Sequence, residues 1–70
     1  MVIEMDNVVH LVTSATQAGR LLLESWPGAQ TSLRRSARFA CVAALENGDN
    51  ELCRTLFVEA AREAHILRND

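Results

Sequence analysis

An unbroken apolar segment in the middle of the chain constrains its fold more than any other feature. The segment reads Phe39-Ala40-Cys41-Val42-Ala43-Ala44-Leu45. It belongs to a predicted helix over about residues 32–47, which Asn47-Gly48 would end. A helix without a polar face is buried on every side. We therefore expect this helix to be central in the fold or to face a second subunit.

The length of the chain allows one domain over residues 1–70. A domain of this size buries only ~60% of the surface that its unfolded chain exposes. Its stability is marginal unless a disulfide, a metal or a partner subunit contributes. Small size is thus one reason to expect that the chain self-associates.

The charge pattern gives the chain no long-range attraction to nucleic acid or anionic lipid, because its net charge is −2. Its first residues include Glu4 and Asp6 rather than the basic residues of a signal peptide. No apolar stretch approaches the ~18 residues that a membrane span needs. We expect a cytoplasmic protein with reduced thiols, and we expect neither nucleic acid nor a membrane as its partner.

The first twelve residues predict a β-hairpin over about residues 2–12, since two runs rich in β-branched residues flank Asp6-Asn7. Asp and Asn tolerate positive φ and suit a two-residue turn. Alternation places Val8, His10 and Val12 on one face. Because an isolated two-stranded ribbon is marginal in water, the hairpin needs helices on one side and a further strand at its edge would help.

Two more helices are predicted, over about residues 15–26 and 50–67. Ser14 and Gln17 fit a capping box at the start of the first, and Pro27-Gly28 ends it. Val58 falls among polar residues of the last helix and is expected to face water, where it could mark a contact. A short link makes the second and third helices an antiparallel pair. The predicted fold class is α+β, an N-terminal antiparallel hairpin followed by three helices.

The order of certain residues resembles a bacterial family of small proteins catalogued as domain of unknown function 982. The matching features are Ser14, Ala18, Leu22, Trp26-Pro27, Ala37, Cys41, Ala44-Leu45, Gly48, Arg54, Phe57, Ala60-Ala61 and Glu63-Ala64. The resemblance covers nearly the whole chain from Ser14 onward, and the strands match more loosely. It implies the strand-then-helices order and a bacterial cytoplasmic setting, and it implies no activity.

The soft metal ligands of the chain are Cys41, Cys53, His10 and His65, and none is paired at the spacing of a zinc site. Both cysteines fall on apolar helix faces, where a free thiol behaves as a small hydrophobe. His65 is expected near the end of the last helix, where an imidazolium suits the helix dipole. We expect no metal, no cofactor and no catalytic residue.

Two groups of charged residues allow either a functional or a purely structural interpretation. Glu59 and Glu63 lie one turn apart and could act as acid and base, although a solvated charge pattern explains them as well. Arg34, Arg35 and Arg38 lie in the first turns of a helix, where cations meet the positive end of its dipole.

The arginine cluster therefore needs an offsetting partner. It could pair inside the chain with acidic residues, namely Glu24, Glu4 or Asp6. It could instead contact a phosphate or a carboxylate of a partner, because arginine forks and free helix N–H groups bind anions.

Three classes of function follow. The leading hypothesis is a non-enzymatic interaction module that forms a homodimer, by pairing hairpin edges or by packing the second helix against its mate. Its candidate interface residues are Val8, Val12, Phe39, Val42 and Val58. The alternative is a small nucleic-acid-binding regulator or an anion-binding protein that uses the arginine cluster. A small enzyme built at a dimer interface, or a module for another protein partner, comes after these.

Overall fold

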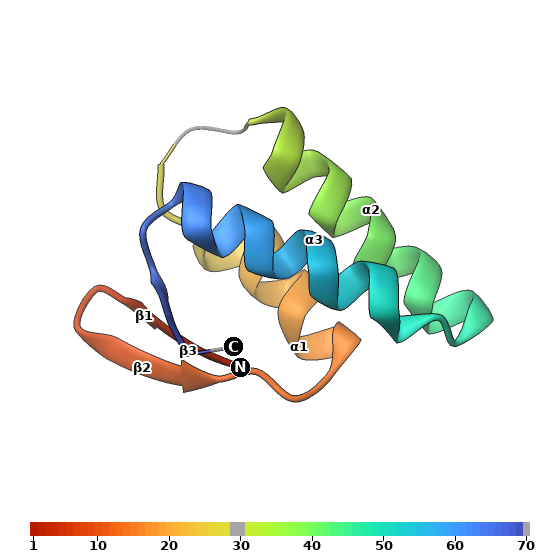
Figure 1. Ribbon diagram of the computed structural model, residues 1–70, viewed down its shortest axis with the longest axis horizontal. Helices are drawn as coiled ribbons and strands as arrows, with labels where there is room; N and C mark the ends of the chain where they lie inside the picture. The colour runs from red at the N-terminus through yellow and green to blue at the C-terminus, as the bar shows by residue number, and fades with distance from the viewer. Residues whose placement is uncertain (29–30, 70) are drawn as a thin grey trace.

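A computed structural model describes residues 1–28 and 31–69 of the chain. The elements in order are β1 (Val2–Met5), β2 (Val8–Leu11), α1 (Ala15–Arg20), the π-helical η1 (Leu21–Ser25), α2 (Ser32–Asn47), α3 (Asn50–Glu63) and β3 (Leu67–Asn69). The predicted hairpin followed by three helices is confirmed, with α2 and α3 packed against each other. Figure 1 shows α2 on the side of the molecule farthest from the strands.

The hairpin turn forms as its sequence predicts. Asp6 and Asn7 have φ angles of 52° and 64°, so both central residues adopt the left-handed conformation of a type I′ turn. Met5 pairs directly with Val8 across this two-residue turn. The turn thereby fixes the register of β1 on β2.

A third strand, β3, was not predicted. Its residues pair antiparallel with β1, Ile3 with Leu67 and Val2 with Asn69, so the sheet order is β2-β1-β3. The prediction that the last helix extends to residue 67 is wrong, because α3 ends at Glu63. The second edge of β1 is therefore covered by the other end of the chain (Figure 1).

The end of α3 explains the change of direction. His65 has a φ of 60°, and its N–H donates to the Arg62 carbonyl at 3.1 Å. The N–H of Ile66 donates to the Ala61 carbonyl at 3.0 Å. These two bonds form a Schellman motif, a common way for a helix to stop. Here a histidine occupies the left-handed position where glycine is usual.

The first helix begins with a variant of the predicted capping box. The Ser14 hydroxyl accepts the N–H of Gln17 at 3.1 Å. The Gln17 side chain accepts from the N–H of Thr13 at 3.0 Å, rather than from that of Ser14, and donates to the Leu11 carbonyl at 2.7 Å. Gln17 thus ties the start of α1 to the end of β2.

The second half of this first helix differs from the prediction. Residues Leu21–Ser25 form a π-helical segment, and Trp26, which precedes Pro27, is extended with φ −67° and ψ 131°. The wider i→i+5 turn shifts the phase of the side chains. Within this segment Leu21 and Leu22 are buried, whereas Leu23 is 59% exposed.

The core lies where the sheet, α1, α2 and α3 meet, and its largest fully buried side chains are Phe57, Ile3, Leu22 and Cys41. The Trp26 and Phe57 rings meet edge to face, with centroids 5.3 Å apart. Such pairs add ~0.5–1.5 kcal/mol beyond the area that they bury.

Two candidate interface residues lie inside the chain. Val58 is only 7% exposed, so the expectation that it faces water is wrong. Its neighbours four residues away on the helix are Arg54 and Arg62, which share this face of α3. Val12 is also buried, and its N–H donates to the Met1 carbonyl at 2.8 Å. Neither side chain has surface left for a partner.

Candidate functional site

The three arginines of the cluster have different contacts in the structure. Arg34 is half-buried and its guanidinium donates to the Leu22 carbonyl, from Nε at 3.0 Å and from Nη2 at 2.8 Å. This carbonyl lies in the last turn of the first helix, where carbonyl groups lack helical partners and the dipole is negative. Arg34 therefore connects α2 to the end of the first helix.

The offsetting acid at the start of α2 is Glu63. The Thr31 hydroxyl caps α2 by accepting the N–H of Arg34 at 3.1 Å, and it donates to the Glu63 carboxylate at 2.6 Å. A negative charge here interacts favourably with the positive end of the α2 dipole and offsets the nearby arginines. The predicted acidic partners are wrong for Arg34, and Glu4 instead binds Arg68 at 3.1 Å. No sequence pattern linked residue 63 to residue 31.

The carboxylate pair has structural partners too. Glu59 forms an exposed ion pair with Arg62 at 3.6 Å, and Glu63 binds Thr31. These contacts fit the solvated charge pattern better than acid–base chemistry, because catalytic carboxylates are usually desolvated.

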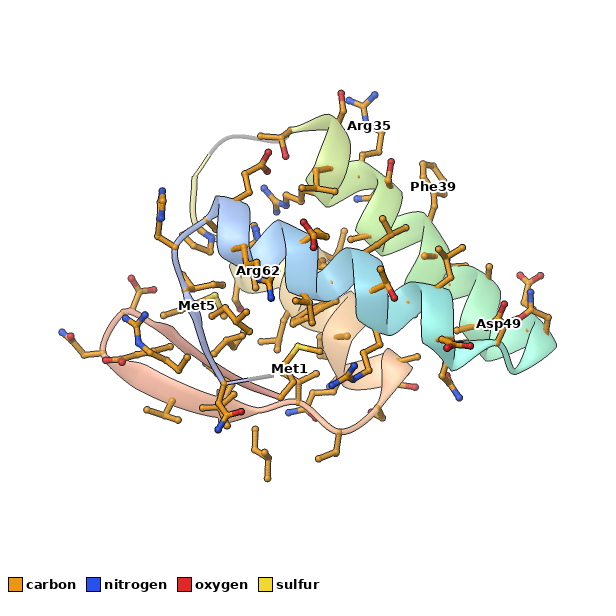
Figure 2. The ribbon with its side chains drawn as sticks, viewed as in Figure 1. Met1, Met5, Arg35, Phe39, Asp49 and Arg62 are labelled. Carbon is orange, nitrogen blue, oxygen red and sulfur yellow. The ribbon has the colours of Figure 1, made fainter. Side chains whose placement is uncertain are left out.

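The other two arginines lie on the outer surface of α2. Arg35 is exposed, and the Arg38 guanidinium lies 5.9 Å from the centroid of the Phe39 ring. Within residues 1–28 and 31–69, neither forms an ion pair with an acidic side chain. Figure 2 shows Arg35 and Phe39 projecting outward from α2, away from the strands.

The outer surface of α2 is also apolar. Phe39, Val42 and Leu45 are 62%, 49% and 60% exposed. Ala37, Ala40, Cys41 and Ala44 lie on the opposite side of the helix and are buried. The segment that is apolar all round is therefore covered on one side only within a single chain. We call the exposed residues Phe39, Val42 and Leu45 the α2 stripe.

A groove between the first helix and α2 extends the stripe. It has a volume of about 390 Å³, and its lining includes Gly19, Leu23, Cys41, Val42 and Leu45. A Cβ built on Gly19 would lie 3.5 Å from the Cys41 Cβ, an ordinary contact, so the two helices approach closely at its floor. Leu23 is 59% exposed and forms one wall.

A second hollow of about 470 Å³ lies between the end of the hairpin and the α2–α3 turn, where its lining includes Val12, Ser14, Asn50 and Arg54. The Ser14 hydroxyl there already caps α1.

The predicted core role of the cysteines is confirmed, since Cys41 and Cys53 are 0% and 4% exposed and both are free thiols. Burial raises the pKa of the Cys41 thiol well above its usual range, and the neighbouring Cys53 thiol raises it further. A neutral thiol is a poor nucleophile. The sequence did not reveal that these thiols, from α2 and α3, lie side by side.

The remaining soft ligands do not gather around a common point. His10 is half-buried on β2 and His65 is exposed after α3. Among the residues that the structure describes, no three His, Cys, Asp or Glu side chains lie together as a metal site would need.

Other exposed apolar residues lie on the edge strand β2, where Val9 and Leu11 on one side are 63% and 61% exposed and Val8 on the other side is 53% exposed. An edge strand with an exposed apolar side can pair with another chain. Of the five candidate interface residues, the structure thus leaves Phe39, Val42 and Val8 at the surface, on two separate elements.

The fold and its surfaces define a small α+β domain with an exposed apolar helix face. The family model described as "Protein of unknown function (DUF982)" matches residues 1–68. The chain therefore belongs to this family, and the match takes in the strands as well as the helices. No curated protein and no solved structure matches the chain.

Within the described part of the chain, no helix is both long enough and apolar enough to cross a membrane.

Proposed function

We propose that this protein is a non-enzymatic interaction module that self-associates as a homodimer. The observation that supports the proposal is the α2 stripe, in which Phe39, Val42 and Leu45 together lie on one exposed helix surface. Single exposed apolar residues are ordinary, whereas apolar residues gathered on one surface indicate a protein contact.

The size of the chain adds support, because a domain of 70 residues gains stability from a partner subunit. The setting that we propose is the bacterial cytoplasm, where the buried free thiols of Cys41 and Cys53 would stay reduced.

The test is the molar mass in solution, measured by light scattering behind size exclusion from ~1 µM to ~1 mM chain, a range that spans weak and moderate association. We expect the mass to rise toward twice the 7.7 kDa of one chain. A well-folded monomer over the whole range would contradict the proposal.

The alternative is a nucleic-acid-binding regulator or an anion-binding protein that uses Arg34, Arg35 and Arg38. It has less support, because Arg34 is engaged with the Leu22 carbonyl and the Glu63 carboxylate lies at the start of α2. Titration of a labelled DNA duplex at low salt would test it, since such binding is strongest there.

A further inference from the structure

We infer that the partner at the α2 stripe is a second copy of this chain, with the two α2 helices packed antiparallel about a twofold axis. The inference rests on the proposed function and specifies its interface. It comes from one exposed face of α2, which carries Arg35, Phe39, Val42 and Glu46.

The spacing of these four residues is the first argument. They lie at i, i+4, i+7 and i+11, so they share one face of the helix. The intervals read four, three, four in either direction. In an antiparallel pair whose axis passes between residues 40 and 41, Arg35 of each copy lies level with Glu46 of the other. Phe39 of each copy then lies level with Val42 of the other.

The charges are the second argument. The first half of α2 carries Arg34, Arg35 and Arg38, and Glu46 lies near its other end. An antiparallel pair sets opposite charges against each other twice, once on each side of the axis. A parallel pair would set arginine against arginine and glutamate against glutamate, and like charges brought together penalise a wrong arrangement.

The apolar centre is the third argument. Phe39 and Val42 flank the twofold axis and would bury each other between the two charged pairs. Leu45, together with Leu23 from the groove wall, extends the apolar surface on the side of the first helix. An apolar centre with a charged rim is the usual anatomy of a protein interface.

The test is a charge-exchange experiment with Arg35→Glu and Glu46→Arg. Each variant alone turns two attractive pairs into two repulsive ones, and we expect its homodimer dissociation constant to rise about tenfold or more, which corresponds to ~1.4 kcal/mol or more. The double variant R35E/E46R restores opposite charges, and we expect it to dimerise within about threefold of the wild type.

Mixing the two single variants gives a sharper result. In a heterodimer of R35E with E46R, the introduced glutamate of one copy lies level with the introduced arginine of the other. The wild-type pair of Arg35 with Glu46 survives on the other side of the axis, so both charge pairs are attractive. We therefore expect the mixture to form a heterodimer about as tight as the wild-type homodimer, measured by light scattering or by native mass spectrometry.

Misfolding does not mimic these results. An acid near the start of α2 and a base near its end both suit the helix dipole, so each single variant should keep the fold. Circular dichroism checks this. Arg62→Gln, which removes a charge from the exposed surface of α3 and breaks the ion pair with Glu59, is the charge control and should leave dimerisation unchanged.

A matched pair of apolar variants separates the α2 stripe from β2. Phe39→Ser and Leu11→Ser remove side chains of nearly equal exposure, 62% and 61%. We expect only Phe39→Ser to dissociate the dimer. A wild-type dimer that survives Arg35→Glu, Glu46→Arg and Phe39→Ser would overturn the antiparallel interface and leave the proposed function standing. A wild-type monomer would overturn both.

Discussion

The guanidinium of Arg34 holds the Leu22 carbonyl with two hydrogen bonds, from Nε at 3.0 Å and from Nη2 at 2.8 Å. This contact joins the start of α2 to the last turn of the first helix across twelve residues of sequence. It turns a cation that opposes the dipole of its own helix into one that complements the dipole of another.

The first prediction concerns this contact. Replacement of Arg34 by Met keeps most of the apolar stem and removes both bonds, leaving the Leu22 carbonyl without this donor. We expect the free energy of unfolding to fall by about 1.5 kcal/mol, since bonds to charged groups contribute more than neutral ones. Urea denaturation would measure this fall.

The control for Arg34 is Arg20→Met, on the exposed surface of the first helix. We expect its effect to stay within about 0.5 kcal/mol. Equal losses in the two variants would mean that the Leu22 contact adds no stability.

The second prediction concerns His65, which adopts a φ of 60°. A left-handed conformation costs a non-glycine residue about 1 kcal/mol, and glycine avoids most of that cost. We expect His65→Gly to stabilise the protein by about 0.5 kcal/mol after the added chain entropy of glycine is counted. Thermal unfolding should then show a Tm higher by a few degrees.

The matched control for His65 is its neighbour Ala64, which has a φ of −83° in the ordinary helical region. There glycine brings its entropic cost and loses the contact of the Ala64 methyl group with the core, so we expect Ala64→Gly to destabilise by about 1 kcal/mol. A loss of stability in both variants would contradict the strain that we assign to His65.

Local chemistry made some of the fold predictable. The predicted bounds of the second helix, about 32–47, agree with Ser32–Asn47, because Gly48 adopts the left-handed conformation with φ 77° that ends many helices. The hairpin turn could also be predicted from the sequence, because Asp6 and Asn7 tolerate positive φ.

The third strand could not be predicted from the sequence, for two physical reasons. The stop signal of α3 is His65 rather than glycine, and Ile66 and Leu67 continue the apolar content of the helix. The partner of β3 is β1 at the opposite end of the chain, and no local propensity encodes such pairing.

The candidate site, too, could be predicted only in part from the sequence. The anomaly of Arg34 was visible as charge against dipole, but its partner was not, because a backbone carbonyl such as that of Leu22 has no signature in the sequence. For the apolar segment that holds Phe39 and Val42, the sequence allowed either a central helix or a helix that faces a second subunit. It could not decide between them, because it does not show which side of α2 the other helices cover.

The third prediction concerns the fully buried Phe57, whose ring meets Trp26 at 5.3 Å. Truncation of a buried Phe to Ala costs ~3–5 kcal/mol, a large part of the stability of a small domain. We expect Phe57→Ala to be mostly unfolded at 25 °C and Phe57→Leu to be folded with a lower Tm. Fluorescence of Trp26, the single tryptophan of the chain, would follow both.

The control for Phe57 is Phe39→Ala, measured at concentrations where the chain is monomeric. Its ring is 62% exposed, so its removal should change the free energy of unfolding by less than about 0.5 kcal/mol. If both phenylalanine variants unfold, the assigned burial of the two rings is wrong.

The last prediction concerns the Cys41 thiol and alkaline pH. Burial raises the pKa of this thiol above its ordinary value of 9.0, so the folded chain keeps its proton at pH values where the unfolded chain loses it. Above pH 9 the unfolded state therefore binds fewer protons, and the free energy of unfolding falls as pH rises. Stability from this group is fully present below pH 9, and we expect a loss of about 1 kcal/mol by pH 10.

The chain has no lysine and no tyrosine to titrate in the same range, and comparison with Cys41→Ala separates the Cys41 thiol from the other groups of the chain. Urea denaturation with reductant present, from pH 7 to pH 10.5, would give the slope. We expect Cys41→Ala to lower stability at every pH, since it leaves a small cavity, but to fall less steeply above pH 9 than the wild type. Parallel slopes in the two proteins would show that the folded chain does not protect the Cys41 proton, and the assigned burial of this thiol between α2 and α3 would then be wrong.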